Sequence, residues 1–353
     1  MTLEIDGSIL EGGGQILRIA LSLSALCRIP VRITKIRANR AKGGLAAQHL
    51  KGIELLRDIC QANVRGAELG SSQIEFEPKT IRGGTFTADT KTAGSIGLLL
   101  QISLPVCLFA DREVTLELKG GTNCEMAPQI DEMTEILRPN LEKFGATFDF
   151  DLLRRGYFPK GGGHCVIKCR PVKSLKAVEI TNFGDYMKIY GWNYVAGTLP
   201  LNLAHDMANG AKNKMQNLPV RANIEVYKED PAIARDNCSG IILCTETTTG
   251  CFIGSGRIGS RKESSKVTGE KAALEMLYAT NSGACVDSHV QDQLIIFMAL
   301  AKGTSRVRTL PLTLHTKTAI HVCELMTKAK FRVVEEGQTC VIECDGIGLE
   351  NSN

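Results

Sequence analysis

The chain has 353 residues, of which 43% are hydrophobic and 23% charged, a composition typical of a globular protein large enough for more than one domain. The formal net charge of +4 is mildly basic, and no long Lys/Arg tail is present, which argues against broad nonspecific binding to duplex nucleic acid. No apolar run reaches the length of a membrane span, so we expect no membrane partner.

A pattern of helices and strands recurs along the chain. A predicted apolar helix followed by a predicted strand occurs three times, at 12–27 and 31–38, at 93–110 and 114–121, and at 292–301 and 307–315. Each strand leads through a loop into an amphipathic helix and closing strands, at 48–60 and 74–78, at 128–145 and 164–171, and at 318–329 and 339–346. This repetition predicts an α/β (α+β) fold of three repeated sheet-plus-two-helix units.

The spacing of the three copies predicts an insertion, because the third copy begins much later than the spacing of the first two would place it. The intervening stretch has its own alternation of strands and helices, beginning with a predicted strand in VEITNF (178–183). We therefore predict a discontinuous main domain, 1–178 with 286–353, and a smaller inserted α/β domain at 179–285.

Three copies around a pseudo-threefold axis would bring their strand-to-helix loops, 37–49, 120–128 and 314–318, to one place. The first of these loops is rich in side chains that suit phosphate: Arg37, Arg40, Gln48 and His49, with Lys42 among them. A guanidinium donates hydrogen bonds as a fork that matches phosphate oxygens. The alternative is a solvated loop.

EGGGQ (11–15) opens the first predicted helix. Glycines allow close approach of the backbone, and the free N–H groups of a helix N-terminus attract phosphate. Glu11 is a candidate ligand for a divalent cation between phosphates. The alternative is a tight turn into a buried helix, and the motif is not a P-loop because no Gly-Lys-Ser/Thr follows. In a second glycine-rich turn, 155–163, a hairpin connection is favoured over a phosphate contact by Lys160.

Of the six histidines, His315 has the most suggestive position. It ends a predicted strand, precedes a predicted helix and occupies the third copy of the loop that holds the arginines in the first. A neutral imidazole there could attack the α-phosphate of ATP. The alternative is a structural histidine, which is the favoured interpretation for His321 in the following helix.

Seven segments together resemble the RNA 3′-terminal phosphate cyclase family, in particular its animal branch. In chain order they are IDGSILEGGGQILR (5–18), IRANRAKGGLAAQHL (36–50), DTKTAGSIGLLLQ (89–101), LKGGTNCEMAPQID (118–131), RGYFPKGGG (155–163), VDSHVQDQLIIFMALA (286–301) and LHTKTAIHVCE (314–324). The resemblance runs over nearly the whole chain and is weakest in the insertion. It implies three similar sheet-plus-two-helix units and one smaller inserted domain, in agreement with the repeats.

The resemblance also implies roles for individual residues. His315 matches the histidine that becomes covalently adenylylated, and Glu11 matches a carboxylate on the metal side. The residues that match the ATP pocket and its surroundings are Gln101, Pro128, Asp292, Gln293, Gln15 and Arg18. Arg37, Arg40, Gln48 and His49 match the region of the RNA phosphate. Relatives usually carry Tyr at the position of His289 in the adenosine wall, Pro at that of Gly43, and often Arg where Ala46 and Ala47 stand.

The implied activity is ATP-dependent cyclisation of RNA 3′-phosphate ends, with Mg²⁺ or Mn²⁺, through a histidine–AMP adduct and an RNA adenylate. One alternative is a noncatalytic RNA-binding relative that acts in ribosome assembly, which would lack the nucleophilic histidine. The other is an enolpyruvyl transferase, which shares related repeats but not the quoted motifs. Thirteen cysteines without a CxxC pair, and a start, MTLEIDGSIL, that resembles no signal peptide, favour a nuclear or cytosolic location.

Overall fold

The computed structural model describes residues 2–352 and begins with a four-stranded sheet. Its strands are β1 (Leu3–Asp6), β2 (Val31–Thr34), β3 (Asn63–Arg65) and β4 (Ile74–Glu77), in the order β1-β2-β4-β3. β1 and β2 are parallel, and the other pairs are antiparallel. Two helices complete this unit, α1 (Gly14–Cys27) and α2 (Ala47–Cys60).

The same topology occurs twice more, which confirms the predicted repeats. The second sheet is β5-β6-β8-β7, from β5 (Gly84–Asp89), β6 (Val114–Gly120), β7 (Phe148–Arg154) and β8 (Gly163–Cys169). The third is β9-β14-β16-β15, from β9 (Glu179–Ile180), β14 (Lys302–Thr309), β15 (Lys330–Glu336) and β16 (Thr339–Ile347). The helices of these units are α3 (Ile96–Cys107), the continuous run α4 (Ile130–Glu132), η1 (Met133–Leu137) and α5 (Arg138–Lys143), and then α8 (Gln291–Leu300) and α9 (Leu314–Thr327).

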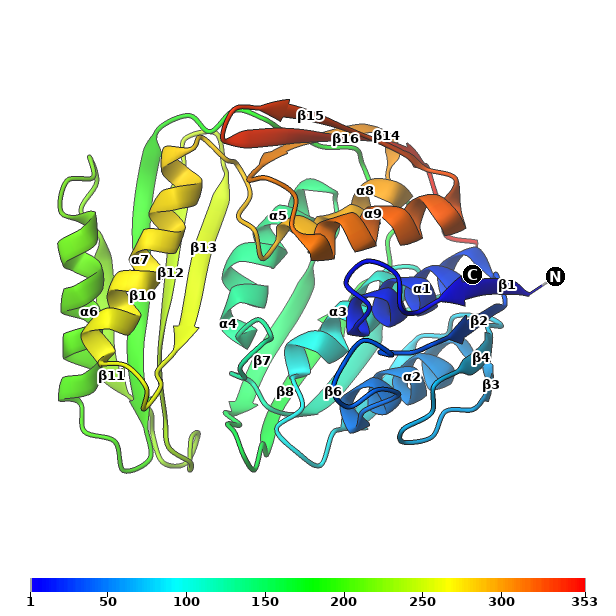
Figure 1. Cartoon of the computed structure of the whole chain (residues 1–353), viewed down its shortest axis with the longest axis horizontal. Coiled ribbons are helices and arrows are strands. Elements are labelled where there is room, and N and C mark those ends of the chain that lie inside the picture. The colour runs from blue at the N-terminus through cyan, green and yellow to red at the C-terminus, as the bar shows by residue number, and fades with distance from the viewer. Residues whose placement is uncertain (1, 353) are drawn as a thin grey trace.

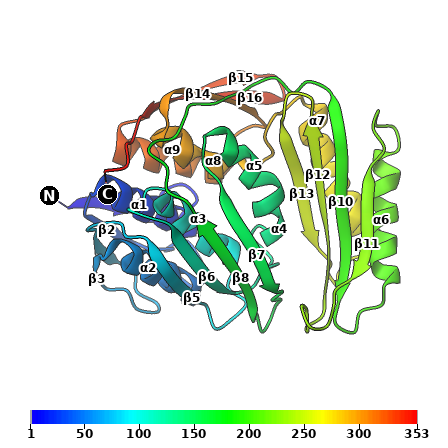
Figure 2. The same cartoon turned by 180° about the vertical axis from the view of Figure 1, so that it is seen from behind.

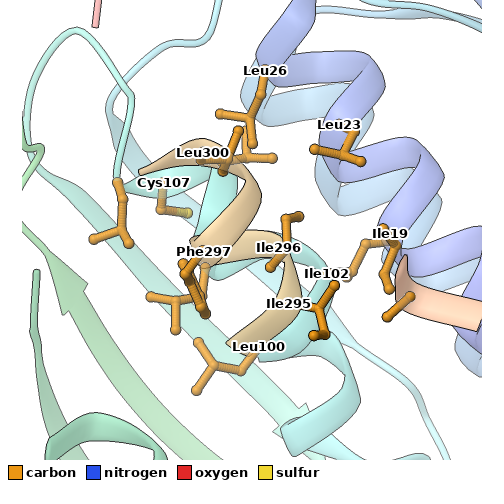
Figure 3. Close-up of a cluster of buried hydrophobic side chains, with 14 of the residues drawn as sticks. Ile19, Leu23, Leu26, Leu100, Ile102, Cys107, Ile295, Ile296, Phe297 and Leu300 are labelled. Atoms are coloured by element: carbon orange, nitrogen blue, oxygen red, sulfur yellow. The ribbon is translucent and has the colours of Figure 1, made fainter. Parts of the chain in front are cut away.

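The first helix of each unit, α1, α3 or α8, lies between the three sheets (Figure 1). Their side chains pack on one another in a single core, to which Leu23, Leu100 and Phe297 contribute (Figure 3). These helices are apolar on nearly every side because neighbours surround them, which is the pattern of a buried helix rather than a surface helix. The corresponding helices therefore meet at the centre of the three units.

Several element boundaries differ from the sequence predictions. The opening strands β1, β5 and β9 were not predicted as parts of the repeat, because two to six residues carry little periodic signal. β9 lies within VEITNF, predicted as the first strand of the insertion, but it pairs in parallel with β14 of the third sheet. Alternation identifies a strand but not its partner. The predicted helix 128–145 contains the π-helical turn η1, and Pro139, which lacks an N–H donor, is the second residue after it.

The inserted stretch forms a fourth sheet in the order β11-β10-β12-β13. Its strands are β10 (Tyr186–Ala196), β11 (Asn223–Lys228), β12 (Cys238–Thr247) and β13 (Phe252–Ile258). The helices α6 (Asn202–Met215) and α7 (Ser265–Asn281) pack on one face of this sheet through a separate apolar cluster that includes Met207 and Met276 (Figures 1 and 2). The division into two domains remains a prediction. Within the described residues 2–352, no helix is long and apolar enough to span a membrane.

Candidate functional site

The three glycines at the start of α1 leave room for side chains from α1 itself and from α2. A Cβ atom on Gly14 would lie 2.6 Å from His49 Nε2 and 2.9 Å from Arg18 Nη1. Gly12 adopts φ +60°, and a Cβ on Gly13 would collide with the Glu11 carboxylate. No side chain caps the N-terminus of α1. The glycines therefore hold a cationic and an imidazole side chain against free backbone N–H groups, a combination that suits an anion.

A hydrogen-bonded chain of side chains links the first unit to the third. Arg18 Nη2 donates to Gln15 Oε1 (2.6 Å), and Gln15 Nε2 donates to Asp292 Oδ2 (2.7 Å). Burial lowers the pKa of the Arg18 guanidinium and raises the pKa of Asp292. The negative charge of Asp292 acts to raise the pKa of Arg18, and the positive charge of Arg18 acts to lower the pKa of Asp292, so each opposes the effect of burial on the other. His315 also acts to lower the pKa of Asp292, so its ring lies within electrostatic range of that carboxyl.

Glu11, the expected metal-side carboxylate, is nearly buried and already engaged. One oxygen forms an ion pair with Arg40, and the other accepts from the Gly13 N–H (2.7 Å), while the Glu11 N–H donates to Thr318 Oγ1 in α9 (3.2 Å). Among residues 2–352, no group of three or more His, Cys, Asp or Glu side chains is placed to hold a metal. One carboxylate fits a Mg²⁺ or Mn²⁺ ion that takes its other ligands from water and phosphate oxygens.

The predicted phosphate residues divide between the first loop and the helix that follows it. Gln48 and His49 lie in the first turn of α2, in agreement with the helix predicted at 48–60. Gln48 Oε1 accepts from the Ser95 N–H (2.8 Å), which ties α2 to the start of α3. Arg37 Nη1 donates to the Gly44 carbonyl (2.9 Å), and Arg40 remains half-exposed.

His49 is electrically neutral at pH 7. Burial, with the positive charges of Arg18 and Arg37, lowers its pKa to about 4. Its Nδ1 accepts from the Ala46 N–H (3.3 Å), which assigns the proton of the neutral ring to Nε2, the atom that faces Gly14. His49 can therefore donate one hydrogen bond toward the start of α1 without adding a charge.

A narrow pocket that is partly open to solvent lies between α1, α3, η1 and α8. Gln101 and Gln293, both predicted for the ATP pocket, line it together with Gln15, Arg18 and Asp292. Gln293 is 8% exposed, and its Oε1 has no hydrogen-bond partner. A buried, unpartnered acceptor is costly unless a bound group donates to it. The apolar wall is formed by Ile19, Leu104, Pro105, Leu137, Ile296 and Phe297.

Two residues predicted for the same pocket do not line it. The Pro128 carbonyl instead lies against Gly97 at the start of α3. A Cβ atom added to Gly97 would be 3.1 Å from this carbonyl oxygen. His289 hydrogen-bonds Glu275 of α7, which also accepts from Arg257 of β13 (2.9 Å). His289 thus connects the start of α8 to the inserted sheet. Lys160, the weaker phosphate candidate, pairs with Asp236 (2.9 Å) at an exposed surface.

His315 lies in the first turn of α9 rather than at the end of a strand, because β14 ends at Thr309 and the helix begins at Leu314. Thr313 caps this helix by accepting the Thr316 N–H (3.1 Å). The Thr313 hydroxyl is a good N-cap, and recognising it would have moved the helix start ahead of His315. The His315 side chain is exposed, as is that of His321 further along α9.

The ion pair of His289 predicts a pH-dependent contribution to stability. The hydrogen bond with Glu275 raises the pKa of His289 to about 9, above the value of about 6.5 for an unfolded histidine. The contribution is therefore fully present below pH 6.5 and is lost as the pH rises through 9. We expect the difference in unfolding free energy between the wild-type protein and His289→Gln, measured by urea denaturation, to be larger at pH 6.5 than at pH 9.5. A difference that grows with pH would contradict this assignment.

Comparison with known proteins adds independent information. Residues 9–333 match the family model described as "RNA 3′-terminal phosphate cyclase". A Drosophila melanogaster protein of that name is 44% identical over 99% of this chain and 98% of its own length. One from Pyrobaculum aerophilum is 38% identical over 99% of both chains, and a "probable" one from Dictyostelium discoideum is 37% identical over 98% and 82%. The enolpyruvyl transferase NikO from Streptomyces tendae aligns with 97% of this chain and 48% of its own, at 11% identity and a TM-score of 0.35.

Proposed function

The chain belongs to the RNA 3′-terminal phosphate cyclase family, and from this membership we propose that it uses ATP to convert an RNA 3′-terminal phosphate into a 2′,3′-cyclic phosphodiester. The observation that carries the proposal for this chain is the position of His315, exposed in the first turn of α9, a helix that packs against α8, where Asp292 is hydrogen-bonded to Gln15. The proposed nucleophile and a partly enclosed pocket lined by Arg18, Asp292 and three glutamines thus lie on adjacent elements.

The reaction takes three steps. A ring nitrogen of His315 attacks the α-phosphorus of ATP, and the bond to pyrophosphate breaks. An oxygen of the RNA 3′-phosphate then attacks the phosphorus of the histidine-bound AMP, the P–N bond breaks, and an RNA adenylate forms. Finally the neighbouring 2′-hydroxyl attacks the 3′-phosphorus, loses its proton and displaces AMP. The last step is intramolecular, so the protein mainly has to position the groups and neutralise charge.

The residues around His315 can supply this positioning. Arg18 and the free N–H groups at the start of α1 suit the triphosphate, and the neutral His49 can donate a further hydrogen bond. The unpartnered Gln293 Oε1 can accept from the exocyclic amino group of adenine. Guanine presents a carbonyl oxygen at the corresponding position, so this acceptor favours ATP over GTP. Glu11 would help to hold a Mg²⁺ or Mn²⁺ ion, whose charge would screen the triphosphate.

The decisive experiment is incubation of the protein with α-³²P-labelled ATP and Mg²⁺ in the absence of RNA. We expect label to remain on the protein through denaturation, at His315 in a peptide map, and to be released as AMP when an RNA 3′-phosphate is added. Absence of a covalent adduct would favour a noncatalytic RNA-binding relative. We also propose a nuclear or cytosolic location, because thirteen cysteines suit a reducing compartment.

The double variant Arg37→Ala/Arg40→Ala is expected to separate the two substrates. Loss of charged hydrogen bonds to the RNA 3′-phosphate should reduce RNA-dependent discharge of the adduct by about 10- to 100-fold. Formation of the adduct from ATP should change far less. Single-turnover rates of the two steps provide the measurement.

Arg82→Ala/Arg112→Ala is a matched control, because it also removes two exposed arginines. Both arginines contact Asp111. Arg112 lies after the C-terminal end of α3, whereas Gln48 contacts the residue before the N-terminal end of that helix. This variant should retain both rates. Equal losses in both steps of the Arg37/Arg40 variant would mean that these two arginines serve ATP instead.

A further inference from the structure

Gln291, the first residue of α8, holds the segment that carries His315. Its side chain is 2% exposed and uses all of its hydrogen-bonding groups within that segment. Oε1 accepts from the Thr313 N–H (3.0 Å) and from the Thr316 hydroxyl. Nε2 donates to Thr309 Oγ1 (3.0 Å) and to the Leu310 carbonyl (2.8 Å). One amide group therefore contacts the end of β14, the connection after it and the first turn of α9.

This contact replaces backbone pairing that the connection lacks. Between Thr309 and Leu314 the chain is neither strand nor helix, so its polar groups need partners from elsewhere. Gln291 supplies a hydrogen-bond donor to the Leu310 carbonyl and an acceptor to the Thr313 N–H. His315 lies between Thr313 and Thr316, two of the residues that Gln291 contacts. The amide thereby fixes the backbone on both sides of the proposed nucleophile.

The first turn of α8 also links this contact to the nucleotide pocket. Successive residues of an α-helix point about 100° apart, so three consecutive side chains face three directions. Gln291 faces the connection to α9, Asp292 accepts a hydrogen bond from Gln15 at the edge of the pocket, and Gln293 lines the pocket. A single rigid turn therefore sets the position of the nucleophile relative to the pocket.

We propose that Gln291 is a positioning residue for the attack of His315 on ATP, an inference that rests on the proposed function. Attack requires the reacting atoms to be aligned at about 3–3.5 Å, and a misplacement of about 1 Å can cost about 100-fold in rate. Without the amide, the start of α9 keeps its Thr313 cap and its packing on α8 but loses the hydrogen bonds that Gln291 accepts from Thr313 and Thr316. Binding of ATP and the final cyclisation do not use His315, so neither should depend strongly on Gln291.

The test uses Gln291→Met, which preserves the length of the side chain and removes its hydrogen bonds. We expect single-turnover formation of the AMP adduct to fall about 100-fold. The dissociation constant of a non-cleavable ATP analogue should change by less than about threefold, and so should the rate at which a supplied pre-adenylylated RNA cyclises. A residue needed only for folding would affect all three measurements together.

Asn140→Leu is the matched control, because Asn140 is a fully buried amide that joins α5 to the inserted sheet. Its Nδ2 donates to the carbonyls of Ile136 (2.9 Å) and Phe252 (3.1 Å). This variant should lose a similar amount of stability in urea and keep the wild-type rate of adduct formation. If Gln291→Met does not fold, Thr316→Val removes one partner of the same amide and should slow adduct formation about fivefold or more.

Three outcomes would overturn the positioning role. The first is a wild-type rate of adduct formation in Gln291→Met. The second is a loss of ATP-analogue binding and of cyclisation in Gln291→Met that parallels its loss of adduct formation. The third applies if Gln291→Met does not fold, and it is a wild-type rate of adduct formation in Thr316→Val. These results differ from failure of the proposed function itself. In that case the wild-type protein would form no adduct, or peptide mapping would place the AMP on a residue other than His315.

Discussion

His315→Ala is expected to form no covalent AMP adduct and to lose ATP-dependent cyclase activity by several orders of magnitude. The imidazole is the proposed nucleophile, and its removal eliminates a covalent intermediate rather than weakening one contact. The variant should fold normally, because the side chain is exposed and the cap formed by Thr313 does not involve it. Retained label from α-³²P-ATP and product formation from RNA 3′-phosphate are the measurements.

His321→Ala is the control for this prediction, because His321 is a second exposed histidine on the same helix. It should keep most of the wild-type activity. A supplied pre-adenylylated RNA bypasses the first two steps, so His315→Ala should still cyclise it. A stable AMP adduct on the His315→Ala protein would show that another residue is the nucleophile.

Arg155→Met is expected to lower the free energy of unfolding by about 3–5 kcal/mol, the usual result of removing one partner from a buried ion pair. Arg155 donates to both oxygens of Asp131 (2.6 and 2.8 Å) and to Glu229 Oε1 (3.0 Å). All three side chains are at most 10% exposed. The substitution leaves two buried carboxylates without their cation at the contact between α4 and the inserted sheet. Urea denaturation at pH 7 measures the effect.

Arg82→Ala provides the comparison, because Arg82 pairs with Asp111 at the surface and its side chain is 50% exposed. Screening by solvent limits such a pair to about 0–1 kcal/mol, so this variant should remain close to the wild-type stability. Similar losses in the two variants would show that burial does not decide the strength of the Arg155 pair. If the inserted domain unfolds separately, Arg155→Met should also split the denaturation curve into two transitions.

The repeated architecture was predictable from the sequence because each unit has long elements of clear periodicity. The helices 12–27, 93–110 and 292–301 are apolar over enough residues to be recognised, and they form the centre of the molecule as α1, α3 and α8. The short strand β9 was assigned to the wrong sheet, because pairing with β14 is a choice between distant partners. Local periodicity contains no information about that choice.

The sequence by itself also determined the family, because seven motifs in order are far more specific than any one of them. It also identified His315 as a candidate nucleophile, and Arg18, Gln101 and Gln293 as candidate residues of the ATP site. Only the tertiary structure decided how these side chains meet. The bond between Gln15 and Asp292 spans 277 positions in the chain, and the contacts of Gln291 and Arg155 join separate elements. Helix and strand periods specify which face of an element is buried, whereas hydrogen bonds between elements depend on packing in three dimensions. The tertiary structure therefore placed Asp292 beside Gln15, turned His289 toward the inserted sheet, and attached the His315 segment to Gln291.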